Sequence, residues 1–398
     1  MRKRPRVLLM SQDVHPIPPQ GGAAVEQWVD AVSHAMTRWD PLVVSVNHPF
    51  RNDSERVGRV CYERVRTGWL YVKVFRKLTR LDPWSYLDRV SALAKRFGPD
   101  LIHLHNAPEF VDGLARRMRG VPIILHMHNT LPPKFSSDVA ALVGCSRYVA
   151  DWYRDKGVIS PIIDVLPNGV DTKRLFPPDP VRQAVLRAKY EIPDDRFTIL
   201  YVGRMAEEKG PDRLVEAFSR LDPKRFHLIL LGEWRTKSKS AGDKRAAFAE
   251  YLSSQVARLP KGSVTVLGLF PPDVAQQLYG LADLLVIPSR FEEPFSMVAI
   301  EAMASGVPVL AVRRGGMPEY MRHEQNALLM DGDSSPERIA SELESAAANP
   351  ARLQEIAFEA RRMVESRFSW EEVAGQTQAF YERVLESSSP NKSGMLKG

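Results

Sequence analysis

The sequence is poor in cysteine and has no long apolar run. Its 398 residues include two cysteines, Cys61 and Cys145, which excludes the dense disulfide framework of small secreted domains and favours reduced thiols. No apolar stretch approaches the roughly 20 residues that a membrane-spanning helix needs. The short apolar run near the N-terminus ends at Gln12 and Asp13, before it reaches the length of a signal-peptide core. We therefore expect a cytoplasmic protein.

Two common nucleotide-binding signatures are also missing. The sequence contains neither the GxxxxGK[ST] loop of P-loop NTPases nor the GxGxxG fingerprint of ordinary dinucleotide-binding domains. Their absence argues against both classes of protein.

Acidic residues are comparatively few in the first part of the chain. Residues 1–170 hold 24 Lys and Arg against 16 Asp and Glu, a charge of +8, so the remainder holds 31 against 32, and the total is +7. Such a bias attracts phosphates, acidic sugars, anionic lipid or nucleic acid, although a basic surface commonly serves solubility alone.

The length and the alternation of elements predict two α/β domains. A chain of 398 residues exceeds one ordinary core, and short β-branched runs alternate with helical patterns along both halves, which is typical of parallel sheets covered by helices. We predict an N-terminal domain over residues 1–175 and a C-terminal domain over 176–369, facing each other across a ligand cleft at the carboxyl ends of their strands. A last helix over 370–387 is expected to pack on the first domain, ahead of a disordered tail over 388–398.

One candidate anion site follows the strand predicted at residues 198–202. Arg204 and Lys209 flank a short polar loop, and Pro211 suits the first turn of the next helix. The free amides at a helix N-terminus favour anions, so this spacing fits a diphosphate clamp. The alternative is that both are solvated loop charges.

A carboxylate in an apolar helix marks a second candidate site. The stretch MVAIEAMA, residues 297–304, is apolar all round except for Glu301, and a buried carboxylate needs hydrogen-bond donors. Pro294 suits the start of this helix and Gly306 its end. The amides of Phe295, Ser296, Met297 and Val298 would be open to an anion or a sugar edge, and the two hydroxyls of a ribose would suit Glu301.

These residues resemble a known family. Glu293 and Glu301 resemble the E-x7-E signature of retaining glycosyltransferases of the GT-B fold, and GRMAEEKG (203–210) resembles their phosphate-clamp loop. The family is glycosyltransferase family 4. The similarity covers nearly the whole chain, through QGGAAVEQWV, DLIHLHN, ILHMHN, LPNGVDTKRLF and RRGGMPEYM. The GGxxxE loop and the GEW sequence are nearest to a branch that includes spore-coat-associated transferases.

The resemblance implies a role for each matching residue. Arg204 and Lys209 would hold the donor diphosphate and stabilise the leaving phosphate, Glu301 would hold the ribose, and Glu293 would contact hydroxyls of the donor sugar. The remaining matches are in the predicted N-terminal domain: Gly21 and Gly22 would let the backbone approach the diphosphate, and His128 would contact the donor sugar.

The expected enzyme is a retaining glycosyltransferase that needs no metal or other cofactor. It would transfer a sugar from a nucleotide-diphosphate sugar, with a UDP-sugar favoured, to a glycan, lipid-linked or small-molecule acceptor held by the basic N-terminal domain. The family usually has glycine at the position of Ser296, which leaves open an assembly or binding protein with little turnover. A nucleotide-sugar 2-epimerase shares the architecture but not this pair of motifs.

Four histidines lie in two HxH pairs, at 103 and 105 and at 126 and 128. Neighbouring strands carrying them could supply nitrogens to a metal. The resemblance implies instead that His103, His105 and His126 line the cleft or are packed, because the fold needs no metal for the leaving group.

Other candidates are weaker. Ser146 and Arg147 are placed near the acceptor, and Cys145 is interpreted as a buried small side chain rather than a nucleophile. The segment 68–87 interleaves aromatic and basic residues, which fits either a peripheral membrane contact or an ordinary helix with a solvated basic face. Charge alone would also allow nucleic-acid binding, which we do not expect.

Overall fold

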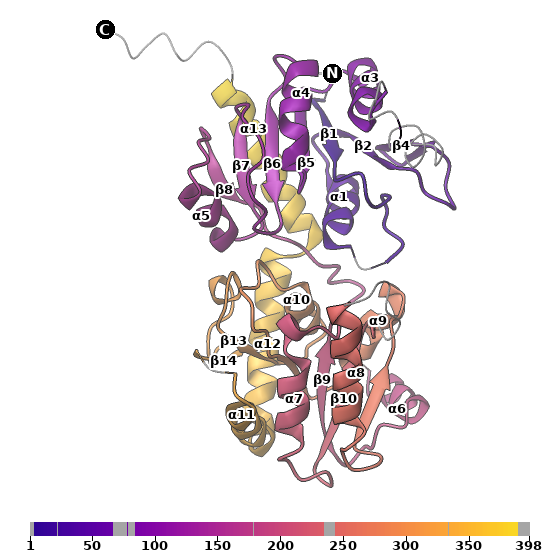
Figure 1. Ribbon diagram of the computed structural model, residues 1–398, viewed down its shortest axis with the longest axis vertical. Helices are drawn as coiled ribbons and strands as arrows, with labels where there is room; N and C mark the ends of the chain where they lie inside the picture. Colours follow the sequence, from indigo (N-terminus) through magenta and orange to yellow (C-terminus); the bar gives the residue numbers. More distant parts are fainter. Residues whose placement is uncertain are drawn as a thin grey trace. The chain divides into compact units, whose positions relative to one another are not determined.

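The computed structural model describes residues 4–21, 23–66, 78, 84–177, 179–234, 243–332 and 334–388. It divides into two compact units (Figure 1). Met1–Asn168 and Trp370–Gly398 form the N-terminal unit, and Gly169–Ser369 form the C-terminal unit. The division therefore falls after Asn168, whereas the sequence placed it after residue 175. The residues predicted as a disordered tail lie outside the described part of the chain, apart from Ser388, which ends the last helix.

The N-terminal unit contains an eight-stranded sheet in the order β3-β4-β2-β1-β5-β6-β7-β8. Every neighbouring pair is parallel except β3 and β4. The strands are β1 (Arg6–Met10), β2 (Asp40–Val46), β3 (Ser54–Val57), β4 (Val60–Val65), β5 (Leu101–His105), β6 (Ile123–Met127), β7 (Ala141–Gly144) and β8 (Ile163–Val165). The helices include α1 (Ala24–Ala35), α3 (Tyr86–Phe97), α4 (Val111–Arg117), α5 (Arg147–Asp155) and α13 (Trp370–Ser388), with a short 3-10 turn at Pro108–Phe110.

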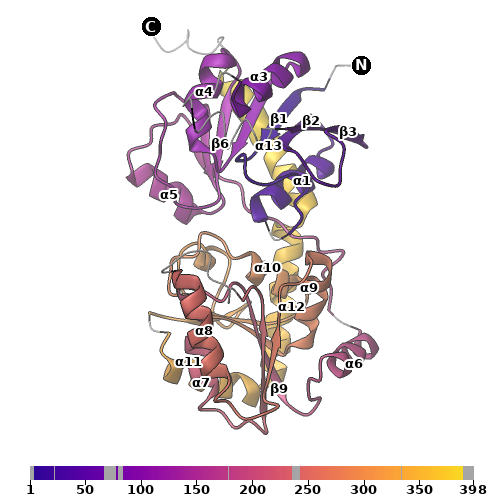
Figure 2. The same ribbon diagram turned by 45° about the vertical axis from the view of Figure 1, so that its right-hand side comes forward.

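One face of this sheet is covered by α1 and α13, which pack against each other (Figures 1 and 2). Val7 and Leu9 of β1 share a buried cluster with Trp28 of α1 and Tyr381 of α13. Because successive side chains of a strand point to opposite faces, Leu8 and Met10, which are equally buried, pack on the other face. Burial on both faces explains why these strands are continuous apolar runs.

The C-terminal unit contains a six-stranded parallel sheet in the order β11-β10-β9-β12-β13-β14. The strands are β9 (Phe197–Val202), β10 (Phe226–Leu231), β11 (Val264–Leu267), β12 (Leu284–Ile287), β13 (Val309–Val312) and β14 (Leu328–Met330). The helices are α6 (Pro180–Lys189), α7 (Pro211–Phe218), α8 (Lys244–Val256), α9 (Pro272–Leu278), α10 (Met297–Ala304), α11 (Pro336–Ala348) and α12 (Pro350–Arg367). Three 3-10 turns are η3 (Glu207–Lys209), η4 (Tyr279–Leu281) and η5 (Met317–Glu319).

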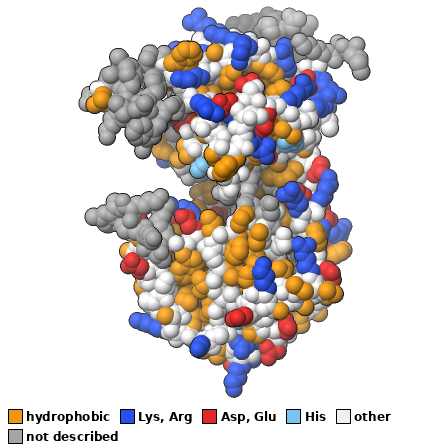
Figure 3. All heavy atoms as spheres, turned by 90° about the vertical axis from the view of Figure 1, so that its right-hand side faces the viewer, with side chains coloured by type: hydrophobic (Ala, Val, Ile, Leu, Met, Phe, Trp, Pro, Cys, Tyr) orange, Lys and Arg blue, Asp and Glu red, His pale blue; other side chains and the backbone are white. Residues whose placement is uncertain are grey.

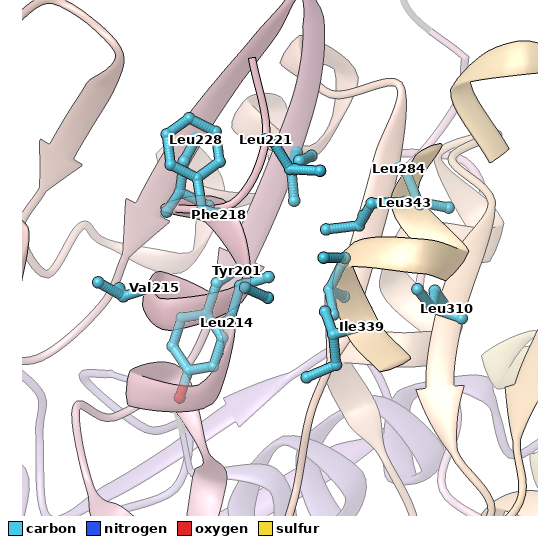
Figure 4. Close-up of a cluster of buried hydrophobic side chains, with 14 of the residues drawn as sticks. Tyr201, Leu214, Val215, Phe218, Leu221, Leu228, Leu284, Leu310, Ile339 and Leu343 are labelled. Atoms are coloured by element: carbon cyan, nitrogen blue, oxygen red, sulfur yellow. The ribbon is translucent and has the colours of Figure 1, made fainter. Parts of the chain in front are cut away.

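Helices α7, α8 and α11 cover one face of this second sheet, and α10 and α12 cover the other (Figure 2). Figure 4 shows how Leu214 and Phe218 of α7 and Ile339 and Leu343 of α11 lie against strand side chains such as Leu228. Burying a side chain of this size contributes about 1.5–3 kcal/mol, so the packing holds α7 and the loop before it in one position on the sheet.

The strand order creates a switch point in each unit. In the C-terminal unit the chain runs outward from β9 to β10 and β11 and then returns to β12 on the other side of β9. The loops that follow β9 and β12 are therefore both at the carboxyl ends of the strands, and they diverge there. Ligands of doubly wound sheets bind in the crevice between two such loops. The equivalent point in the N-terminal unit lies between β1 and β5.

Charged side chains of both signs are spread over the face of each unit seen in Figure 3, with Lys and Arg prominent on the N-terminal unit. Among the described residues, no helix combines the length and the apolar character needed to cross a membrane. Neither cysteine forms a disulfide, and Cys145 is fully buried, as its interpretation as a small packed side chain required.

Candidate active site at the strand ends

Lys209 and Glu293, predicted separately from the sequence, form an ion pair at the switch point of the C-terminal unit. The Lys209 ammonium donates to both carboxylate oxygens of Glu293, at 2.9 and 3.2 Å. The hydroxyl of Ser289 donates to the same carboxylate at 2.6 Å. Lys209 Nζ also lies 4.5 Å from the centre of the Phe291 ring. Glu293 is buried, so its charge is compensated by a cation and a hydroxyl together.

The loop after β9 is held in place by its glycine and by a second ion pair. Gly210 adopts a left-handed conformation at the start of α7, and a Cβ there would lie 2.2 Å from the carbonyl oxygen of Pro288. Only glycine permits that close approach between the two loops. Arg290 in the loop after β12 donates to both carboxylate oxygens of Asp212 in α7, one contact being 2.6 Å long. Bidentate pairs of this kind fix geometry as well as adding energy.

The loop after β13 packs against the backbone of Glu293. The backbone carbonyl of Glu293 accepts a hydrogen bond from the amide of Gly316 at 2.8 Å. Gly315 has a φ of +57°, and a Cβ on it would lie 2.1 Å from that same carbonyl oxygen. The two glycines of RRGGMPEYM, Gly315 and Gly316, therefore allow this loop to contact the backbone of Glu293 closely.

Arg204 lies in the same loop as Lys209 but makes a weaker contact. Its guanidinium is 3.4 Å from Glu208, and its side chain is 45% exposed. Its backbone carbonyl accepts from the hydroxyl of Tyr201 at 2.8 Å. An exposed pair of this kind contributes little to stability, so the Arg204 side chain can reorient toward an anion at low cost.

Helix α10 begins later than the sequence suggested. It starts at Met297 rather than at Pro294, because Ser296 is its N-cap and the Ser296 hydroxyl accepts from the amide of Ala299 at 3.4 Å. Gly306, with a φ of +71°, follows its end as expected. The amides of Phe295, Met297 and Val298 donate to no acceptor within the described residues, which leaves them available to an anion.

Glu301 is less buried than its apolar neighbours. Met297, Val298 and Glu301, three and four positions apart, are partly exposed while the rest of α10 is buried. Residues at this spacing share one helix face, so Glu301 belongs to the accessible face. Its carboxylate accepts from the hydroxyl of Tyr279 at 2.6 Å. Burial raises the pKa of Glu301 to about 7, although the Tyr279 hydrogen bond works in the opposite direction.

His128 lies just beyond β6 in the N-terminal unit and both its ring nitrogens have partners. Nδ1 is 2.9 Å from Oδ1 of Asn168, and Nε2 is 3.2 Å from Nδ1 of His105. Burial lowers the pKa of His128 to about 4, so the ring is neutral near pH 7. It is partly exposed, unlike its histidine neighbours.

His103, His105 and His126 are completely buried. They were expected to line a cleft or to be packed, and the structure shows the second. Their side chains lie on the same face of the sheet as those of Leu101 and Ile124, which is the face covered by α1 and α13.

The other predicted positions in the N-terminal unit are less informative. Gly21 is exposed, with open space around it, and Gly22 lies outside the described residues. Ser146 is buried and caps α5, since its hydroxyl accepts from the amide of Val149 at 3.3 Å, while Arg147 begins that helix on the surface. The aromatic and basic segment 68–87 falls largely outside the described residues.

Sequence patterns did not reveal several of the partners. Ser289 and Tyr279 hold the two glutamates, and Asp212 and Arg290 join the two loops. Each is a single polar residue whose importance depends on which strands become neighbours. No local pattern distinguishes them from surface residues.

The two doubly wound parallel-sheet units, with an ion pair at the switch point of the second, define the architecture of a GT-B glycosyltransferase. Comparisons with known proteins agree. Residues 25–174 match the family model described as Glycosyltransferase Family 4, and residues 183–363 match that of Glycosyl transferases group 1. The chain belongs to glycosyltransferase family 4 and is a glycosyltransferase.

Several relatives span almost the whole chain. The lipopolysaccharide 1,2-N-acetylglucosaminetransferase of Salmonella typhimurium is 28% identical, with 95% of this chain and 98% of the relative aligned. Spore coat protein SA of Bacillus subtilis is 25% identical, over 95% and 99%. A D-inositol 3-phosphate glycosyltransferase of Streptomyces bingchenggensis is 32% identical, over 72% and 67%.

Solved structures show the same fold. Anabaena HepE in complex with UDP-glucose superposes with a TM-score of 0.73 at 22% identity, over 95% of this chain and 99% of that one. The sucrose-phosphate synthase of Thermosynechococcus elongatus gives 0.74 at 23% identity, over 96% and 100%.

Proposed function

We propose that the protein transfers a sugar from a UDP-sugar to an acceptor hydroxyl with retention of the anomeric configuration, and that the reaction requires no metal at the diphosphate. The acceptor is a glycan, a lipid-linked sugar or a small molecule. The enzyme acts in the cytoplasm or at the inner face of the membrane. Complexes of HepE with UDP-glucose and with UDP support the choice of nucleotide, and the Salmonella relative, named for N-acetylglucosamine transfer, makes UDP-N-acetylglucosamine the first donor to test.

One observation carries the proposal: the bidentate contact of Lys209 with the buried Glu293 at the switch point. An ammonium held there by a carboxylate keeps a donor available for a phosphate oxygen, because lysine has three N–H groups and Glu293 engages two directions. Arg204 in the same loop and the open amides of Met297 and Val298 can add further positive potential for a diphosphate.

The second glutamate suits the ribose. Glu301 keeps one oxygen on Tyr279 and lies on the accessible face of α10. Two vicinal hydroxyls can donate to an ionised carboxylate, and their hydrogen bonds favour the charged form, so nucleotide binding should lower the raised pKa of Glu301.

The chemical step balances without a protein nucleophile. The bond between the anomeric carbon and the diphosphate oxygen breaks, the acceptor oxygen bonds to the same face of that carbon, and the acceptor proton passes to the departing phosphate. Lys209 and Arg204 would stabilise the negative charge that develops on the phosphate. Glu293 and His128 would orient the donor sugar.

Ser296 gives no support to an inactive assembly protein. Its hydroxyl caps α10, so serine replaces glycine with a gain of helix capping and adds one small side chain.

The test is product formation with the matching UDP-sugars, analysed by NMR for the anomeric configuration of the product. Lys209→Ala should lower turnover by at least 100-fold, since removing one group that stabilises transition-state charge typically costs this much. Lys224→Ala is the matched control. Lys224 is exposed and lies just before β10, at the amino ends of the strands and not at the carboxyl ends where Lys209 lies. Full activity of a folded Lys209→Ala variant would contradict the proposal, and an inverted product would contradict retention.

A further inference from the structure

Three buried histidines in the N-terminal unit each have a ring nitrogen with no partner. These are Nε2 of His103, Nε2 of His105 and Nδ1 of His126, each shielded from solvent and without a hydrogen bond among the described residues. An unpaired polar atom in a protein interior destabilises the folded state. Three such atoms on neighbouring rings require an explanation.

The hydrogen bonds of His105 fix its tautomer. The amide oxygen of Asn168 accepts from Nδ1 of His128, at 2.9 Å, so Nε2 of the neutral His128 ring carries a lone pair. That lone pair accepts from Nδ1 of His105, at 3.2 Å. The proton of His105 is therefore on Nδ1, and its partnerless Nε2 holds a free lone pair.

His126 reaches the same state through the backbone. Its Nε2 is 3.0 Å from the carbonyl oxygen of Leu166, which can only accept, so the proton is on Nε2 and the partnerless Nδ1 holds a lone pair. His103 has Nδ1 2.6 Å from the hydroxyl of Tyr381. When this nitrogen donates to the tyrosine oxygen, Nε2 of His103 provides a third lone pair.

The three rings lie near one another in the protein interior. One nitrogen of each ring lies within 4.8 Å of one nitrogen of the other two. His105 and His126 are directly paired across β5 and β6.

We propose that His103, His105 and His126 form a binding site for Zn²⁺ or a similar first-row divalent ion in the N-terminal unit, next to His128. Zinc binds imidazole nitrogen at about 2.0–2.1 Å, commonly with three protein ligands and a fourth open position. The site departs from the sequence-based expectation that no metal is present. The three histidines come from β5 and β6 and contact Trp28. The centre of the Trp28 ring lies 4.6 to 5.3 Å from the centres of the three imidazoles.

Loading the site requires a small ring movement. The planes of His103 and His126 are nearly parallel, 7° apart with centres 5.3 Å apart, so both side chains must shift for their lone pairs to meet at one ion. Tyr381, Leu166 and His128 contact the outer nitrogens. Such outer partners orient histidine ligands in metal sites. The partly exposed His128 marks the side from which an ion would enter.

The experiment uses the full chain, prepared without a histidine tag. Metal content is measured by mass spectrometry, and the chelator-treated protein is titrated with Co²⁺ and with Zn²⁺. The expected results are about one ion per chain, the visible absorption of a nitrogen-ligated Co²⁺ site, and a melting temperature raised by about 5 °C in a large excess of Zn²⁺.

Variants assign the ion to this cluster. His126→Asn should lose the ion and the Co²⁺ absorption, while His227→Asn is the matched control, since His227 is a buried histidine of the C-terminal unit that contacts Thr265. Tyr381→Phe keeps the packing and should weaken the affinity by about tenfold or more, which provides a test if His126→Asn does not fold. The proposal is overturned if the wild-type chain holds no ion and gives no Co²⁺ absorption, or if His126→Asn retains both.

Discussion

Replacing Glu301 with glutamine should stabilise the C-terminal unit in alkaline solution. Burial raises the pKa of Glu301 from 4.5 to about 7, so the folded protein binds this proton more tightly than the unfolded chain does. The stabilising contribution of the carboxyl is complete below pH 4.5 and is lost as the pH rises through 7. Glutamine is neutral at every pH and can still accept from Tyr279.

The magnitude follows from the two pKa values. A difference of about 2.5 pH units, at about 1.4 kcal/mol each, corresponds to about 3 kcal/mol. Glu301→Gln should therefore match the wild type near pH 4.5 and exceed its unfolding free energy by about 3 kcal/mol at pH 8.

Denaturant unfolding at the two pH values, with hydrogen exchange of the α10 amides to report on the C-terminal unit, measures this difference. The ¹³C shift of the Glu301 carboxyl gives the pKa directly. Tyr279→Phe should raise that pKa further, because it removes the hydrogen bond that lowers it. Equal stabilities of wild type and Glu301→Gln at pH 8 would refute the reasoning.

Substitutions at three further positions test the framework of the site. Ser296→Ala should cost about 1 kcal/mol through loss of the cap, and Ser296→Gly only a few tenths; thermal unfolding distinguishes them, and equal losses would argue against a capping role. Gly315→Ala should cost about 1–3 kcal/mol and reduce turnover, because its Cβ would meet the Glu293 carbonyl; normal stability and kinetics would contradict this. Arg290→Met should cost about 2 kcal/mol by leaving Asp212 partly buried without its cation, and a denaturant titration showing no loss would mean that the pair is dispensable.

The sequence was sufficient for the fold, and it singled out Lys209 and Glu293, which the structure joins in an ion pair. Short apolar runs alternate with helical patterns along the chain, and this predicted two parallel sheets. The runs are continuous because both faces of such sheets are buried. Lys209 and Glu293 were each identified from local motifs, but their direct contact depends on β9 and β12 being neighbours. Spacing along one chain cannot specify that adjacency.

Tertiary context explains what the sequence did not predict. Pro294 is compatible with a helix start, yet the helix begins where the Ser296 hydroxyl can satisfy an amide. Glu301 was placed correctly in α10, but Tyr279, its partner, comes from a separate 3-10 turn. His103 and Tyr381 are 278 positions apart in the sequence and meet only because α13 returns to the N-terminal unit.

The most direct test of the account is calorimetric titration of the purified protein with UDP in the absence of divalent metal. ADP, GDP and TDP serve as comparisons, and Lys209→Ala and Glu301→Ala as variants. We predict selective binding of UDP that is weakened by at least tenfold in both variants. Absence of binding, or binding that neither substitution changes, would contradict the assignment of the diphosphate and ribose to this site.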